Sequence, residues 1–302
     1  MRLQHLHLLL TIAHTGSLRA SAETLNVTQP ALTKALKQLE EEFGTTLVIR
    51  SPKGVRLAPA GELLAARAAT VVREIDRARE EVEWLTRHAQ ATVTVGVSPA
   101  AALMLAPQAV SRFQSRWPQV RVRLVDALYP TALAQLRSGE LDLALGPLPA
   151  TGLGRDLEAR ALIDSPEVIA ARAGHPLAKS RQLADLADAN WVLTGPTQGP
   201  GDPAHLQMEK LGLPPPRITL ECESFSTLLA VLPRMDAVAL MPRRFFESHG
   251  PRIGLVVLPI AEALPLTTIH LFLRTDSPLT VPTQRLMDAF VSEAQALRRA
   301  RN

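Results

Sequence analysis

The chain has 302 residues, of which 46% are hydrophobic, and it carries a formal net charge of +4 at pH 7. This length suits about two domains, and the hydrophobic fraction can fill a sizeable core, so the composition argues against wholesale disorder. The only cysteine, Cys222, excludes an internal disulfide and a cysteine-ligated metal cluster, and it fits a reducing compartment.

The N-terminal stretch does not have the pattern of a secretory signal. A short apolar run, Leu8 to Leu10, is flanked by His5, His7 and His14, and no small-residue cleavage site follows it. No stretch approaches the roughly 18 continuous apolar residues that a membrane span needs. We therefore expect a cytoplasmic protein without a membrane partner.

Two short helices are predicted at the start of the chain. Apolar residues recur with a helical period over about residues 3–14, and Gly16 follows as a stop signal. Ser17 can then cap a second helix by accepting a hydrogen bond from its first turn. The apolar residues of this second helix are Leu18, Ala22 and Leu25.

A third helix follows after a tight turn. Thr28 or Gln29 is its expected cap, and Pro30 is tolerated because a first-turn residue needs no intrahelical N–H partner. The expected buried stripe consists of Leu32, Ala35, Leu36, Leu39 and Phe43. The opposite face carries Pro30, Thr33, Lys34 and Lys37.

Two helices joined by a tight turn, the second with polar residues at its N-terminal end, are typical of a helix-turn-helix. The recognition helix of this motif enters the major groove of DNA with its N-terminus first. Gln29 can contact a base edge, most naturally adenine, and Lys34 can reach guanine or phosphate. The alternative interpretation is a surface helix with ordinary polar residues.

A β-hairpin is predicted directly after this helix. The segments 46–50 and 55–57 are strand-like, and the turn between them contains proline and glycine. A hairpin in this place is typical of a wing, and Arg50, Lys53 and Arg56 would then lie near the sugar-phosphate backbone or the minor groove. The run Glu40 to Glu42 would repel phosphate, so it must lie at the far end of the helix.

A long helix is expected from Pro59 to about residue 88. Apolar residues alternate spacings of four and three over about three heptads, which indicates an a/d stripe. A helix of roughly 45 Å is rarely needed inside one domain, so we interpret it as a dimerisation helix. The alternative is that it packs on its own C-terminal domain. The stripe consists of Leu64, Ala68, Val71, Ile75, Ala78, Val82 and Leu85.

The rest of the chain alternates strand-like and helix-like segments, which is typical of βαβ units and a mainly parallel sheet. The first set has expected strands at 92–97, 120–125 and 141–146, with a helix from about 99 to 113 and another over 131–137.

A second set begins near Val168. Its expected strands lie at 191–193, 218–220 and 237–241, with helices near 204–211 and from about Phe225. The late strand 267–273 and the closing helix 281–299 are expected to pack back on the first set. Together these segments predict two α/β lobes with a cleft between them.

The sequence resembles the LysR-type transcriptional regulators over essentially the whole chain. The most specific resemblance lies in GSLRASAETLNVTQPALTKALKQLEEEFGTTLVIR followed by KGVRLAPAG, with support from TVTVGVSP, LRSGELDLALG and HPLA. Thr28 and Thr33 replace serines of the family pattern, which keeps the hydroxyls and adds methyl groups that can contact thymine. The segments VSPA, YPTALAQLRSGELDLAL and GPG are similar to members that respond to small aromatic acids or sulfonates.

The resemblance implies an α/β protein with three parts. These are a winged helix-turn-helix over 1–58, a linker and dimerisation helix over 59–89, and an effector domain over 90–302 like a type 2 periplasmic binding protein. Lobe I would cover about 90–163 and 267–302, and lobe II about 164–266. Such proteins form dimers and usually tetramers on double-stranded promoter DNA, with RNA polymerase as a further candidate partner and no cofactor. The expected DNA-binding residues are Ser17, Thr28, Gln29, Pro30, Thr33, Lys34, Lys37, Arg50, Lys53 and Arg56.

The effector is expected between the lobes, beyond the C-terminal ends of the strands. Ser98 ends the first strand and opens a helix, so its hydroxyl and nearby backbone N–H groups are expected to point into the cleft. The turn Gly199 to Gly201 offers a second set of N–H donors. Because no strong cation is forced into the cleft, we expect a weakly charged aromatic acid or another small organic anion. The candidate residues, each of which can alternatively be an ordinary turn or cap residue, are Ser98, Pro99, Ala100, Tyr129, Thr131, Pro147, Gly199, Pro200, Gly201 and Phe225.

Other functions are less well supported by the sequence. The sequence lacks the usual enzyme signatures, since no Gly-x-Ser-x-Gly, P-loop or His-Glu-x-x-His motif occurs. His175 and His205 are interpreted as surface or capping residues, and Asp142 as a structural hydrogen-bonding residue. A solute-binding protein would need a signal peptide and would leave residues 1–89 unexplained. The remaining alternative is a cytoplasmic small-molecule-binding protein or enzyme with an appended nucleic-acid-binding head.

Overall fold

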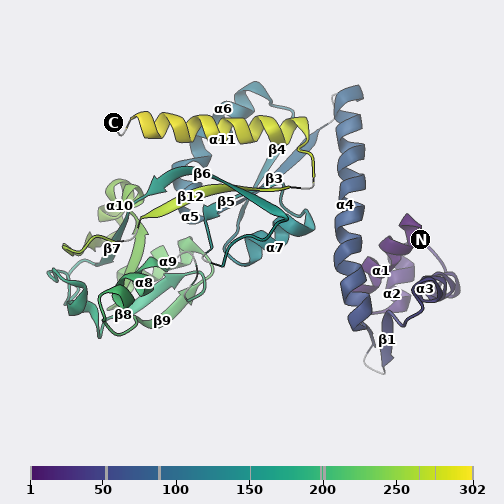
Figure 1. The fold of residues 1–302 in the computed structure, drawn as a ribbon, viewed down its shortest axis with the longest axis horizontal. Coiled ribbons are helices and arrows are strands. Elements are labelled where there is room, and N and C mark those ends of the chain that lie inside the picture. Colours follow the sequence, from purple (N-terminus) through teal and green to yellow (C-terminus); the bar gives the residue numbers. More distant parts are fainter. Residues whose placement is uncertain are drawn as a thin grey trace. The chain divides into compact units, whose positions relative to one another are not determined.

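The computed structural model describes residues 2–51, 54–87, 90–149, 151–197, 199, 202–264, 266–275 and 277–300. The chain divides into two compact units, residues 1–89 and residues 90–302, which we call the head and the effector unit (Figure 1). Across the described residues, no helix combines the length and the apolar character that crossing a bilayer would require.

The head contains four helices and a short hairpin among its described residues. The helices are α1 (Leu3–Thr15), α2 (Leu18–Thr24), α3 (Gln29–Phe43) and α4 (Pro59–Arg87), and the hairpin joins β1 (Val48–Ser51) to β2 (Gly54–Leu57). Gly16 ends α1 in the left-handed region, with φ 63°, as its place after the apolar stripe predicts. The core is built from the apolar stripes of α1, α2 and α3 together with Leu47 and Val48.

One residue of the expected α3 stripe lies outside the core. Leu32, Leu36 and Leu39 are buried as predicted, but Phe43 is 45% exposed. The chain leaves α3 at Gly44, which has φ 62°, and Leu47 takes the next place in the core instead. The helical period therefore extends one turn further than the surface it packs against.

Close backbone contacts hold the hairpin against the helices. Glu40 accepts hydrogen bonds at Oε1 from the N–H groups of Leu47 and Val48, at 2.8 and 3.2 Å. A Cβ on Gly61, in the first turn of α4, would lie only 2.0 Å from the carbonyl oxygen of Leu47. Glu40 therefore fixes the start of the hairpin. The sequence predicted only that this residue would repel phosphate and lie away from the DNA.

The effector unit contains two five-stranded sheets among its described residues, and each defines a lobe. The first sheet has the order β4-β3-β5-β12-β6. Its strands are β3 (Ala91–Val97), β4 (Val120–Asp126), β5 (Leu143–Pro147), β6 (Leu157–Ser165) and β12 (Thr267–Arg274). Its helices are α5 (Pro99–Met104), α6 (Ala106–Arg116), α7 (Thr131–Ser138) and α11 (Val281–Arg299). As predicted, β12 and α11 return to this lobe, where α11 packs on α6 and β6 (Figure 1).

The second sheet has the order β11-β7-β10-β8-β9. Its strands are β7 (Glu167–Arg172), β8 (Asn190–Thr194), β9 (Arg217–Cys222), β10 (Val238–Pro242) and β11 (Leu255–Val257). Its helices are α8 (Pro203–Lys210), α9 (Phe225–Val231) and α10 (Arg243–His249), with short 3-10 turns at Leu183–Leu186, Leu232–Arg234 and Pro251–Ile253. The side chain of Trp191 is fully buried in the core of this lobe.

The effector unit differs from the expected pattern in the strand directions of its sheets and in one helix. Each is mixed, because β12 pairs antiparallel with β5 and β6, and β7 pairs antiparallel with β10 and β11. The expected single helix from 99 to 113 is two helices, α5 and α6, which meet at Leu105. The chain first crosses between the sheets at Pro166, because β6 continues to Ser165, and it returns just before Thr267.

Candidate functional site

One side of α3 is exposed and polar. Gln29, Pro30, Lys34 and Lys37 are exposed and Thr33 is partly exposed, whereas the buried leucines lie on the other side of the helix. Thr28 caps the helix by accepting a hydrogen bond from the Ala31 N–H at 3.3 Å. The expected recognition face is therefore free to meet a partner, with its first turn held by the cap.

The turn between α2 and α3 fixes the angle at which α3 is presented. Asn26 adopts φ 53° in this turn, a conformation that asparagine tolerates better than most residues. Ser17 caps α2 through the Ala20 N–H at 3.4 Å. The hydroxyls of Ser17 and Thr28 thus accept from their own helices, and each keeps an O–H that can donate to phosphate.

The hairpin displays its two described arginines on opposite faces. Arg50 lies opposite Val55, and Arg56 lies opposite Ile49, in an antiparallel register. Residues directly opposite each other share a face, and neighbours along a strand alternate. Arg50 therefore shares the face of Val55, while Arg56 points to the other side. Lys53 lies outside the described residues.

The cations of this surface differ in how they are paired. Lys37 lies 3.5 Å from Glu41, and Arg19 lies 3.1 Å from Glu23. Within the described part of the head, Lys34, Arg50 and Arg56 have no ion-pair partner. Uncompensated, exposed cations beside a helix N-terminus suit a polyanion such as DNA.

One part of the apolar stripe of α4 is buried within the head, and another part is exposed. Ala68 is buried against Leu6 of α1, together with Val72, and Leu64 packs on the main core of the head. This part of the predicted dimerisation stripe is therefore occupied within the chain, because α4 begins beside α1 and packs along it. Further along, Val71 and Val82 are 46% and 59% exposed, Ala78 is exposed and Ile75 is partly exposed. The side chain of Leu85 lies outside the described part.

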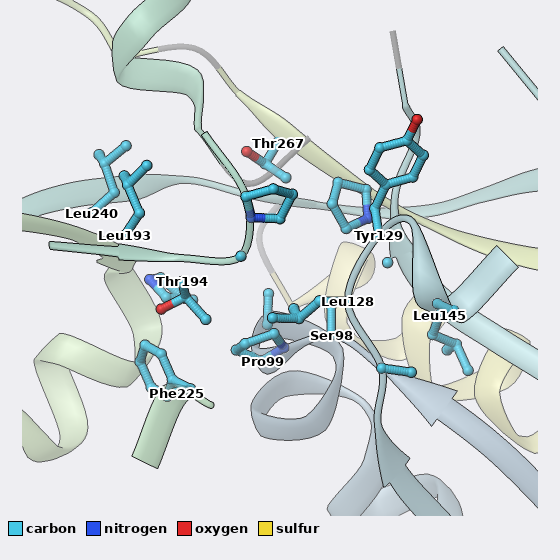
Figure 2. Close-up of a pocket in the computed structure, with 18 of the residues that line it drawn as sticks. Ser98, Pro99, Leu128, Tyr129, Leu145, Leu193, Thr194, Phe225, Leu240 and Thr267 are labelled. Carbon is cyan, nitrogen blue, oxygen red and sulfur yellow. The ribbon is translucent and has the colours of Figure 1, made fainter. Parts of the chain in front are cut away.

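A pocket lies between the two lobes of the effector unit. Figure 2 shows Leu193, Thr194 and Phe225 of the second lobe facing Tyr129 and Leu145 of the first. Its volume is about 100 Å³, and one water molecule needs roughly 10–15 Å³ on this measure, so a small organic molecule fits. The walls are mainly apolar side chains at the C-terminal ends of strands, where ligands bind in open α/β sheets.

Six of the predicted effector residues line this pocket: Ser98, Pro99, Ala100, Tyr129, Pro147 and Phe225. Thr131 does not, because α7 contributes its next two residues, Ala132 and Leu133, to the lining instead. Gly199 is also absent from the lining, and its N–H donates to the Pro196 carbonyl in a local turn. Pro200 and Gly201 lie outside the described residues.

The backbone donors expected near Ser98 are largely used within the protein. The Ser98 N–H donates to the Leu145 carbonyl at 2.7 Å, and the Ser98 hydroxyl accepts from the Ala101 N–H at 3.4 Å. Pro99 has no N–H to offer. The Ser98 O–H therefore remains the main donor that this corner can turn toward a ligand.

Three polar residues of the pocket were not predicted from the sequence: Glu167, Thr194 and Thr267. The Thr194 hydroxyl oxygen is buried and has no hydrogen-bond partner among the described residues. The Thr267 hydroxyl donates to Glu167 Oε1 at 3.2 Å. Burial raises the pKa of Glu167 to about 7, and the hydrogen bond from Thr267 opposes this rise. The one available signal was their place at strand ends, since no local motif marks them.

The residues considered for an enzyme have structural contacts. Asp142 Oδ2 accepts from the Thr94 N–H at 2.7 Å and so links β3 to the start of β5. His175 Nδ1 accepts from the Leu177 N–H at 3.0 Å, and burial is the main cause that lowers the pKa of His175. In the described ranges, no cluster of three or more histidine, cysteine, aspartate or glutamate residues is placed to hold a metal ion.

Comparison with known proteins matches both units to one family. Residues 3–62 match the bacterial regulatory helix-turn-helix protein of the lysR family, and residues 86–295 match the LysR substrate binding domain. The transcriptional regulator TdcA of Escherichia coli K12 is 26% identical over 263 residues, which are 87% of this chain and 84% of that protein. The regulator PcaQ of Agrobacterium fabrum is 27% identical over 299 residues, 98% of this chain and 96% of PcaQ.

Solved structures show the same fold. Full-length CbnR in complex with its target DNA has a TM-score of 0.71 at 19% identity, with 98% of this chain and 99% of that chain covered. A full-length OxyR variant from Pseudomonas aeruginosa has a TM-score of 0.65 at 24% identity, with 98% and 95% covered. The chain belongs to the LysR family, as a transcriptional regulator with a DNA-binding and an effector-binding domain and not as an enzyme.

Proposed function

We propose that this regulator binds promoter DNA as a dimer of dimers and responds to a small, anionic aromatic effector in the pocket between its lobes. The observation that supports the DNA contact is the exposed side of α3, where Gln29 and Lys34 are solvent-facing and Lys34 has no ion-pair partner among the described residues. Gln29 is proposed to contact adenine, and Lys34 to contact guanine or phosphate. On this proposal the protein acts in the cytoplasm, with RNA polymerase as a further partner.

The wing is proposed to contact the DNA backbone. Arg50 and Arg56 point to opposite faces of the hairpin. The two side chains are therefore not equally well placed to contact the phosphates of one DNA strand. Arg56 lies on the face turned away from the head's core residues Val55 and Leu57, so we assign it the larger phosphate contribution.

Dimerisation is proposed to use the outer half of α4. The exposed stripe Val71, Ile75, Ala78 and Val82 remains after α1 has covered the start of the helix. Burial of exposed valines against a second copy is favourable, at about 25 cal/mol per Å² of apolar surface. Two heads held in this way match a two-fold symmetric DNA site. Val82→Glu, which places a charge in the stripe, should dissociate the dimer in analytical ultracentrifugation. Glu83→Gln, at the neighbouring exposed position, should not.

The pocket supports a small aromatic acid as effector. Leu193, Leu240 and Phe225 offer an apolar surface for a ring, and the hydroxyls of Ser98 and Thr194 can donate to an acidic group. Binding is proposed to close the lobes about the crossings at Pro166 and Thr267, and so to shift an existing conformational equilibrium of the assembly.

The test uses the full-length protein and its own upstream DNA. Binding is followed by fluorescence anisotropy at several salt concentrations, since phosphate contacts make the affinity fall steeply with salt. Candidate aromatic acids are then titrated while the fluorescence of the buried Trp191 and the promoter footprint are recorded. No retention of the upstream DNA at low salt would refute the DNA part of the proposal, and no response to any aromatic acid would refute the effector part.

A further inference from the structure

The effector pocket contains a carboxyl group where an acid-binding site would ordinarily contain a cation. None of the described residues that line it is a lysine, an arginine or a histidine. Glu167 is the one carboxyl side chain among them. If it were ionised, it would repel an acidic ligand in a largely apolar environment, where such repulsion is strong.

The fold holds Glu167 at the wall between the lobes. It is the first residue of β7, directly after the crossing at Pro166, and it is only partly exposed. Its Oε1 accepts a hydrogen bond from the Thr267 hydroxyl, which lies at the second crossing between the lobes. Within the described structure no second donor reaches this carboxyl, so its other oxygen is available to a ligand.

The described charged and titratable groups near Glu167 are Asp164, Tyr129, Arg243 and Glu262. Asp164 on β6 accepts from the Thr268 hydroxyl at 2.7 Å, and the Tyr129 hydroxyl contacts Thr151 at 3.3 Å. Arg243, at the start of α10, and Glu262, before β12, border an adjacent cavity of about 320 Å³ that Glu167 also touches. Neither belongs to the effector pocket, and among the described residues no ion pair joins Arg243 to Glu167.

We propose that Glu167 recognises the acidic group of the effector as a neutral carboxyl, whose O–H donates a hydrogen bond to the effector's carboxylate. This inference rests on the proposed aromatic-acid effector and specifies how the pocket holds it. The bond requires no covalent change: when Glu167 is ionised in the free protein, one proton is taken from solvent on binding and released on dissociation. The Thr194 hydroxyl, for which the described structure offers no partner, supplies a second donor.

This arrangement predicts a pH dependence of opposite sign to that of a counter-ion. Burial raises the pKa of Glu167 to about 7, so the neutral form predominates only below this pH. Below this pH the affinity for a carboxylate should be level, down to the pKa of the ligand itself. Above it the affinity should fall by up to about tenfold per pH unit, because the proton must first be taken up.

The experiment uses full-length protein and three ligands of similar shape: benzoate as the carboxylate, benzamide as the neutral analogue and benzamidinium as the cation. Isothermal titration calorimetry is run from about pH 6 to about pH 8.5 in two buffers of different ionisation enthalpy, which reports proton uptake. Glu167→Gln keeps the shape, an amide donor and an acceptor for Thr267, so it is expected to bind benzoate without pH dependence. Glu158→Gln, an exposed position on β6, is the matched control and should behave as wild type.

The outcomes separate the inference from the function on which it rests. Benzoate binding with proton uptake at pH 8 that is lost in Glu167→Gln supports the inference. Benzoate binding without proton uptake overturns it but leaves the aromatic-acid effector in place. Tighter binding of benzamidinium with rising pH shows Glu167 to be an ionised counter-ion and overturns both. If none of the three ligands binds, the effector proposal fails, and the inference fails with it.

Discussion

The exposed side of α3 and the wall of the effector pocket are opposite kinds of binding surface. The first presents Gln29 and Lys34 to solvent, while the second is mainly apolar and, among the described residues, has one carboxyl side chain, that of Glu167. Charges in water bind through many weak, salt-screened contacts, whereas buried polar groups are few and each matters for specificity. The two surfaces should therefore respond differently to salt, to pH and to single substitutions.

The largest expected effect lies in the head. Gly61→Ala would place a methyl group 2.0 Å from the Leu47 carbonyl, so α4 or the hairpin must move. Overpacking of this kind costs on the order of 3 kcal/mol. We expect the head to unfold at lower denaturant concentration and DNA binding to be lost, with ligand binding by the effector unit retained. Ala66→Ser, at an exposed position of α4, is the control. Loss of both activities would show that the two units do not fold independently.

Glu167→Gln should stabilise the effector unit at alkaline pH. Because the pKa of Glu167 is about 7 in the folded protein and 4.5 ordinarily, the folded state holds more protons between these values. Stability therefore falls as pH rises from about 4.5 to about 7 and then stays level. Allowing for partial exposure, the variant should gain about 2 kcal/mol at pH 8 and nothing near pH 4. Urea unfolding at the two pH values measures this, and an equal gain at both would contradict it.

Lys34→Ala should weaken DNA binding by about tenfold, which corresponds to about 1.4 kcal/mol. Within the described residues of the head Lys34 has no ion-pair partner, so its full charge is available to the DNA. Anisotropy with the upstream DNA should also show a salt dependence reduced by about one phosphate contact. Arg19→Ala, which removes a cation already paired with Glu23, is the matched comparison and should change the affinity less. Equal losses in the two variants would mean that general charge, and not the α3 face, governs binding.

The smallest expected effect is that of Thr194→Val. In the part of the chain that the structure describes, no group hydrogen-bonds to the buried Thr194 hydroxyl, and replacing such a group with a methyl group of similar shape should stabilise the free protein by about 1 kcal/mol. The same change should weaken binding of an acidic ligand, because one donor is lost. Thermal unfolding with and without benzoate tests both directions. A variant that is less stable without ligand would show that the hydroxyl already has a partner, such as an ordered water.

The head was predictable in detail because its signals are local. The caps Ser17 and Thr28, the stop at Gly16 and the apolar period of α3 lie within a few residues of the structure they specify. The errors there concern which residues of an apolar stripe a neighbouring element covers. Phe43 continues the helical period of α3 but lies beyond the core, and Ala68, expected at a dimer interface, is covered by α1. Which turn of a helix is covered depends on elements far away in the sequence.

The pocket was predictable only in part. Strand ends and the helix start at Ser98 indicated one wall, and Tyr129, Pro147 and Phe225 lie in the lining as expected. Thr131 and Gly199 were wrong as lining residues because α7 turns Ala132 and Leu133 toward the pocket instead of Thr131, and because Gly199 lies in a local turn. Glu167 and Thr267 are 100 positions apart in the sequence, and their hydrogen bond follows from the two crossings between the lobes.

The sequence by itself determined the family, the helix-turn-helix with its exposed cations, and the alternation of strands and helices that builds two lobes. It could do so because capping, helical period and strand period are properties of neighbouring residues. Only the tertiary structure decided which part of α4 stays exposed and that the partly exposed Glu167 lines the pocket between the lobes. Burial and the pKa it sets depend on what the whole fold packs around a side chain, and no short stretch of sequence contains that information.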